Sequence, residues 1–130
     1  MSKNGFPNPS VVLTKQQARK FLLNHHHLLK PRALPGRQGI LEVIQLLGCI
    51  QFDPVNVVGR NPDLVLQARV RDYQPSILND LLYKERLLWD GWDKLASIHL
   101  AGDWHYFGRH RKHMLEEYGK PEDPPMQIAG

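Results

Sequence analysis

The sequence predicts an α+β fold that is mainly helical, because three or four amphipathic helical segments precede one segment with the pattern of a β-hairpin. This order is typical of a winged helix-turn-helix module with a small β-hairpin wing. The length of 130 residues favours one domain with a modest core. We expect an irregular lead-in over residues 1–12, the winged-helix domain over residues 13–117, and a tail or linker over residues 118–130.

The composition is ordinary for a globular domain, with 42% apolar and 23% charged residues. Seventeen Lys and Arg against thirteen Asp and Glu give a formal charge of +4, which favours an anionic partner without singling out nucleic acid. The single cysteine, Cys49, cannot form an internal disulfide, so a reducing cytoplasm fits best. No stretch of the sequence is long and apolar enough to predict a membrane span.

The first predicted helix begins at a capping box, Thr14-Lys15-Gln16-Gln17, in which the Thr hydroxyl and the Gln amide each satisfy a backbone donor. Its apolar members are expected to form a buried stripe: Ala18, Phe21, Leu22 and Leu28. The run His25-His26-His27 closes this helix. Consecutive side chains on a helix point in different directions, so we predict no metal site there.

A basic loop over residues 30–39 follows, broken by Pro and Gly, and fits either a phosphate contact or a solvated connector. A second helix is predicted from about Gln38 to Leu47, and Gly48 can end it in the left-handed conformation.

The next residues are predicted to form a short extended segment, in which alternate side chains share a face. Ile50 and Phe52 would then point toward the core. Gln51 and Asp53 would point the other way, as an amide beside a carboxylate that can hold and activate a water molecule.

Two more helices are predicted before the hairpin. Asn61 is a good N-cap with Pro62 after it, and the second of these helices opens near Pro75. The Pro75 helix has apolar residues at core spacing: Ile77, Leu78, Leu81 and Leu82. The hairpin is expected over residues 87–100 with Gly91 near its turn, and Gly102-Asp103 would cap a last helix with a basic side.

Four stretches then carry a resemblance. They are residues 46–60 with the Gln-apolar-Asp element Gln51-Phe52-Asp53, residues 61–66 with Arg69, Asp72-Tyr73 with the Pro75 helix, and residues 88–94 with the pattern acid-x-Trp-x-basic. Together they resemble the winged-helix DNA glycosylases that excise alkylated purines and unhook interstrand crosslinks. The likeness covers most of residues 13–116, and we expect the chain to be the N-terminal portion of such an enzyme.

The resemblance implies hydrolysis of the N-glycosidic bond of N7-alkylated purines in duplex DNA, with no metal and no other cofactor. Asp53 would act as general base and electrostatic stabiliser, while Gln51 would orient the attacking water. Six cations are predicted to neutralise phosphates: Arg60, Arg69, Arg71, Arg109, Arg111 and Lys112. A single module of this kind is expected to bind DNA weakly and to be inactive alone.

Other interpretations stay open at this point. Asp53 can simply cap a turn before Pro54, and Trp89 and Trp92 can either stack on a base or pack in the wing. The chain can also be a non-catalytic DNA-binding module in which the helix from about Asn61 enters the major groove. A third possibility is a protein-interaction module, which predicts an exposed apolar patch.

Overall fold

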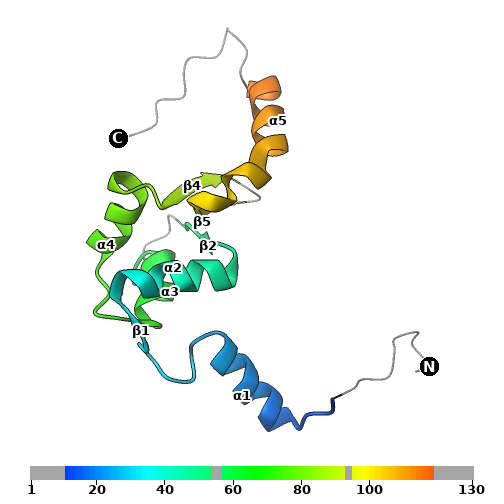
Figure 1. Ribbon diagram of the computed structural model, residues 1–130, viewed down its shortest axis with the longest axis vertical. Coiled ribbons are helices and arrows are strands. Elements are labelled where there is room, and N and C mark those ends of the chain that lie inside the picture. The colour runs from blue at the N-terminus through cyan, green and yellow to red at the C-terminus, as the bar shows by residue number, and fades with distance from the viewer. Residues whose placement is uncertain (1–10, 54–56, 93–94, 119–130) are drawn as a thin grey trace, which may run out of the picture.

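The computed structural model describes residues 11–53, 57–92 and 95–118 (Figure 1). Its helical segments are α1 (Lys15–His25), α2 (Gly36–Leu47), α3 (Asn61–Gln67), α4 (Pro75–Asn79), the π-helical turn η1 (Asp80–Lys84), the 3₁₀ helix η2 (Ala101–Phe107) and α5 (Gly108–Tyr118). Its strands are β1 (Leu34–Pro35), β2 (Ile50–Gln51), β3 (Val70–Arg71), β4 (Leu88–Trp92) and β5 (Ala96–Leu100).

Most of the predicted lead-in and tail lies outside the described residues, as do Pro54 and Lys94 of the motifs quoted above. The boundaries 13–117 of the domain stay a prediction. Within the described residues, no helix is long and apolar enough to cross a membrane.

The elements from α2 to β5 follow the order of a winged helix, which confirms the predicted α+β class. β4 and β5 form the wing, an antiparallel pair in which Leu88 lies opposite Leu100. β2 joins the other edge of β5, with Ile50 opposite Ile98. A second, parallel pair was not predicted: β1 pairs with β3, and Leu34 lies opposite Val70.

The core lies between α2, the helices α3 and α4–η1, and the three-stranded sheet. Its fully or nearly fully buried apolar side chains are Leu34, Ile40, Val43, Ile44, Ile50, Leu66, Val70, Leu78, Leu81, Leu82, Leu88 and Ile98. α2 ends at Gly48, whose φ of +80° is the positive value predicted for this stop.

The start of α1 is confirmed, but its predicted burial is not. Thr14 and Gln17 form the capping box, with each side chain bonded to the other residue's backbone N–H. The expected buried stripe is wrong, since Phe21 is 61% exposed, Leu22 54% exposed, and Leu28 is exposed as well. The physical reason is placement: α1 lies away from the core at one end of the molecule (Figure 1).

The wing follows the prediction, whereas the last helix differs from it in detail. Gly91 is the penultimate residue of β4, opposite Ser97, and so lies near the turn. A Cβ atom at Gly91 would come within 2.2 Å of the Trp89 ring, so glycine is required there by close approach. The last helix begins as the 3₁₀ helix η2 and becomes α-helical only at Gly108.

Candidate nucleic-acid interface

α3 and α4–η1 form the helix-turn-helix, and the strand β3 lies in the connection between them. In this motif the second helix enters the major groove, so α4–η1 holds the recognition position. The helix from Asn61, which the sequence suggested for this role, is the first helix of the pair, so the order of the elements favours α4–η1 in its place. The reason is that α3 ends already at Gln67, and the helix that directly precedes the wing is α4–η1.

The exposed side of α4–η1 is mostly polar. Leu78, Leu81 and Leu82 face the core. The residues that face solvent are Ser76, Asn79, Lys84 and the aromatic Tyr83, which is 59% exposed. Lys84 Nζ lies 2.7 Å from a carboxylate oxygen of Asp80, one helical turn earlier. No function is predicted for these side chains from the sequence, because only the order of the elements in the fold identifies this helix as the second of the pair.

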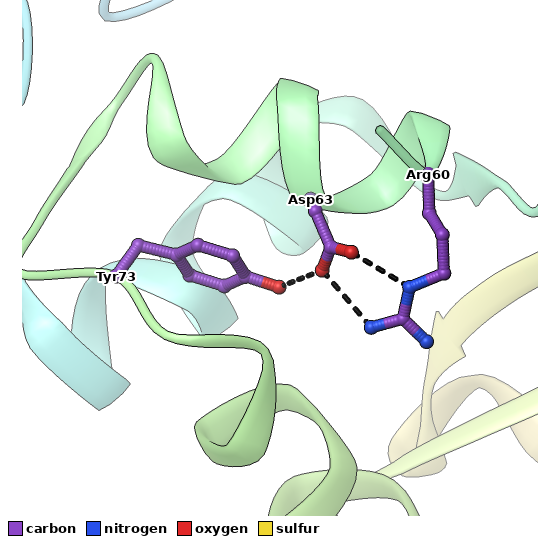
Figure 2. Close-up of polar contacts among 3 residues, drawn as sticks. All are labelled: Arg60, Asp63 and Tyr73. Atoms are coloured by element: carbon purple, nitrogen blue, oxygen red, sulfur yellow. Dashed lines mark hydrogen bonds and ion pairs between the residues drawn. The ribbon is translucent and has the colours of Figure 1, made fainter. Parts of the chain in front are cut away.

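Arg60, Asp63 and Tyr73 form a clamp around the start of α3 (Figure 2). Arg60 donates two hydrogen bonds to the Asp63 carboxylate, at 2.7 and 3.2 Å. The Tyr73 hydroxyl donates to the same carboxylate at 2.5 Å. Because Tyr73 immediately precedes the Gln74 cap of α4, the clamp ties the first helix of the pair to the start of the second.

The clamp changes the acid–base properties of its members. Hydrogen bonds to Asp63 raise the pKa of Arg60 above its ordinary value. Burial, together with the bond to Asp63, raises the pKa of Tyr73 far above its ordinary value. Arg60 therefore stays charged but is engaged inside the protein, which weakens the prediction that it contacts phosphate directly.

Arg69 is also engaged internally. Its guanidinium donates to the backbone carbonyl of His26 at 2.9 Å and to that of Val65 at 2.8 Å. Burial lowers its pKa below the ordinary value of arginine. Arg69 thus holds the C-terminal end of α1 against α3.

Arg71 has a different environment, since it is exposed and lines a polar pocket of about 330 Å³. Arg32, from the basic loop, lines the same pocket together with Gln67 and Asp72. Arg32 and Asp72 both adopt positive φ angles, +52° and +53°, which are rare for residues other than glycine. Two guanidinium groups and an amide at one pocket suit a phosphate oxygen, although Asp72 offsets part of the charge.

The other three predicted cations lie on α5. Arg109 and Lys112 are exposed, whereas Arg111 lies over the Trp104 ring, 4.0 Å from its centroid, and donates to the Trp104 carbonyl at 2.5 Å. α5 lies beyond the wing and far from α3 (Figure 1). The structure thus divides the six predicted cations between two separate regions.

Gln51 and Asp53 flank the end of β2. Gln51 is exposed, and its backbone carbonyl accepts a hydrogen bond of 2.8 Å from the Asn61 side chain. Asp53 is half-buried. Ile50 is buried and Phe52 packs against the core, as the alternation predicted. In the part of the chain that the structure describes, no three His, Cys, Asp or Glu side chains gather as metal ligands.

Comparison with known proteins gives one informative result. The family model of the winged-helix domain of large helicase-related proteins matches residues 13–112 of this chain. Neither the curated proteins nor the solved structures include a significant match.

This finding overturns the resemblance to the DNA glycosylases and the glycosidic-bond hydrolysis that it implied, because the matching family is related to helicases. The catalytic roles predicted for Gln51 and Asp53 depended on that resemblance and lose their basis with it. A winged-helix domain is compatible with a nucleic acid partner, but nothing in the match points to alkylated bases. With 100 of its residues matched in one continuous span, the chain belongs to the winged-helix domain family of large helicase-related proteins.

Proposed function

We propose that the chain is a non-catalytic nucleic-acid-binding domain that places α4–η1 in the major groove of duplex DNA. The observation that carries this proposal is the polar, exposed side of the second helix of the helix-turn-helix. Asn79 is the best-suited base-reading side chain on that face, since its amide both donates and accepts. The helicase-related family supports a nucleic acid partner.

Phosphate contacts would come from the exposed cations. We assign this role to Arg71 with Arg32 at the polar pocket, and to Arg109 and Lys112 on α5. Arg60 and Arg69, which are bonded within the protein, would instead support the geometry of the helix pair.

The test is fluorescence anisotropy with a labelled duplex over a series of salt concentrations. Arg71→Gln is expected to lower the affinity and to reduce the slope of log K against log salt by about one. Lys20→Gln on the exposed side of α1 is the matched control and is expected to change neither quantity. Asn79→Ala is expected to lower affinity with no change in the slope, because it removes no charge.

A wild-type chain that shows no salt-dependent binding to duplex DNA would contradict the proposal. Equal effects of Arg71→Gln and Lys20→Gln would show that binding follows net charge rather than the proposed interface.

A second candidate function, protein interaction, is favoured by one observation. α1 and the residues around it expose a group of apolar side chains: Val11, Val12, Leu13, Phe21, Leu22, Leu23, Leu28 and Leu29. The simplest partner is a second copy of the chain. Sedimentation of the wild type and of Phe21→Ser over a range of concentrations tests this, because self-association through α1 would be weakened in the variant.

A further inference from the structure

One face of α1, called here the α1 face, is apolar and open to solvent. It is formed by side chains at the spacing i, i+3, i+4 and i+7: Ala18, Phe21, Leu22 and His25. Phe21 and Leu22 are more than half exposed, and the Phe21 ring stacks on His25 with ring centroids 6.1 Å apart. This spacing is the one by which an amphipathic helix lies in an apolar groove of another protein.

α1 is tied to the body at its C-terminal end, which leaves the α1 face uncovered. Arg69 donates to the His26 carbonyl at 2.9 Å, and His27 Nε2 lies 3.5 Å from a carboxylate oxygen of Glu42. No residue of α1 is buried. α1 thus projects from one end of the molecule, and α5 lies at the other end (Figure 1).

An open groove of about 510 Å³ lies between the wing and α5, and its lining is mainly apolar. The lining residues with a formal charge are Asp90 and Arg111, whose charges offset each other. Arg111 lies over the Trp104 ring, 4.0 Å from its centroid. The groove is therefore nearly neutral, and it suits a group of apolar side chains rather than a polyanion.

Some rings of the groove are fixed by the wing, and other lining residues are open to solvent. Trp89 donates from its indole nitrogen to the Leu100 carbonyl at 3.0 Å. Trp104 and Phe107 meet the Trp89 ring edge-on, at centroid distances of 4.8 and 4.9 Å. The exposed apolar members of the lining are Trp92 (60%), Leu115 (71%) and Tyr118 (60%). A pre-formed apolar groove of this kind loses little conformational entropy when a partner binds.

The charge of the chain is divided in a way that favours contact between two copies. Residues 1–41 contain seven of the seventeen Lys and Arg and none of the thirteen Asp and Glu, so they carry +7. Residues 42–130 have ten Lys and Arg against thirteen Asp and Glu, so they carry −3. The segment that holds α1 is therefore attracted to the body of a second copy. Two α1 helices packed on each other would instead bring together like charges, those of Lys15, Arg19 and Lys20.

We infer that α1 of one copy docks in the groove between β4 and α5 of a second copy. Because the α1 face and the groove lie at opposite ends of the molecule, a chain does not fill its own groove, and the two copies contribute different surfaces (Figure 1). Phe21 and Leu22 meet the aromatic lining in this arrangement. The inference rests on the second candidate function, protein interaction, and it names the surface that receives α1.

Sedimentation velocity of the full chain over a range of concentrations measures this association. Phe21→Ser changes the α1 face, and Leu115→Ser and Trp92→Ser change the groove. Each is expected to raise the Kd of self-association by about tenfold or more. The three side chains are mostly exposed, so the variants should fold. The matched control is Tyr106→Ser, which removes a 75% exposed ring of η2 outside the groove and should leave the Kd unchanged.

A mixture of two variants tests which surfaces meet. The Phe21→Ser chain keeps its groove, and the Leu115→Ser chain keeps its α1 face. An equimolar mixture is therefore expected to form a one-to-one pair at a concentration where neither variant associates alone. If two α1 faces met each other instead, Leu115→Ser alone would associate like the wild type and the mixture would form no new species.

The other outcomes separate the inference from the functions on which it depends. If Phe21→Ser abolishes association and both groove variants associate like the wild type, self-association through α1 stands and the groove is excluded. A wild type that stays monomeric at every concentration overturns both, while duplex binding is still decided by the anisotropy experiment. If that monomer sediments with phosphatidylglycerol vesicles and Phe21→Ser does not, the α1 face belongs to a lipid surface instead.

Discussion

α1 and α2 are amphipathic helices of nearly equal length, 11 and 12 residues, yet they have opposite relations to the core. α2 buries Gly39, Ile40, Val43 and Ile44, whereas no residue of α1 is buried. α5 resembles α1 in this respect and also has no buried residue. The winged-helix body between α2 and β5 is thus packed, and the two terminal helices extend from it (Figure 1).

The comparison shows that helical periodicity predicts an element but not its partner. The apolar face of α2 meets α4 and the sheet, so its burial contributes to folding stability. The apolar side chains of α1 have the same spacing but remain mostly in solvent. We therefore expect mutations in the body to lower stability and mutations in the terminal helices to affect mainly binding.

The largest expected effect is that of Ile44→Ala in α2. Ile44 is fully buried, so its truncation leaves a cavity and should lower the free energy of unfolding by about 2–5 kcal/mol. Urea unfolding followed by circular dichroism measures this change. A decrease in the free energy of unfolding of less than about 1 kcal/mol would show that the body is packed less tightly than the burial of Ile44 indicates.

A smaller loss is expected for Asp63→Ala. Asp63 accepts hydrogen bonds from Arg60 and Tyr73, and this change leaves both partly buried donors without an acceptor. The free energy of unfolding should fall by about 2–3 kcal/mol. The same urea measurement applies. Asp103→Ala, on η2 outside the clamp, is the control, and an equal loss in both variants would mean that the clamp adds nothing specific.

Gly91→Ala tests how tightly the wing packs against Trp89. The added methyl group would overlap the ring, and relieving this overlap is expected to cost about 1–3 kcal/mol. Gly102→Ala adds the same methyl group where no atom lies within 4 Å, and it should be close to neutral. Similar unfolding midpoints for the two variants would contradict the packing described for β4.

Because the pKa of Tyr73 is raised, we expect the folding stability of the winged-helix body to depend on pH in the alkaline range. The pKa of Tyr73 is raised in the folded state, so the folded protein keeps this proton at a pH where the unfolded chain, with a tyrosine pKa of about 10, releases it. The contribution is fully present below about pH 10 and is lost as pH rises further. Unfolding midpoints at a series of alkaline pH values should fall less steeply in Tyr73→Phe than in wild type, and parallel curves would contradict the assignment.

The smallest stability effect is expected for Leu22→Ala on α1. More than half of this side chain is exposed, so its truncation should change the free energy of unfolding by no more than about 0.5 kcal/mol. If Leu22→Ala lowered the free energy of unfolding as much as Ile44→Ala, the contrast between α1 and α2 would be wrong, because α1 would then pack in the core in solution.

Much of the local structure follows from the sequence. The capping box at Thr14, the stop at Gly48, the alternation at Ile50 and Gln51, and the helix opened by Pro75 all depend on residues within a few positions of one another. The same holds for the hairpin, whose strands are adjacent in the chain. These local signals suffice to predict the α+β class and the winged-helix order.

The site required the tertiary structure, because it depends on residues far apart in the chain. Arg69 looks like any other cation in the sequence, and only folding brings it to the backbone carbonyl of His26, 43 positions away. The pairing of β1 with β3 brings Arg32 and Arg71 to one pocket. Residue types and spacing thus determined the helices and the hairpin, whereas the packing of distant segments decided the β1–β3 pair and which side chains remain available to bind.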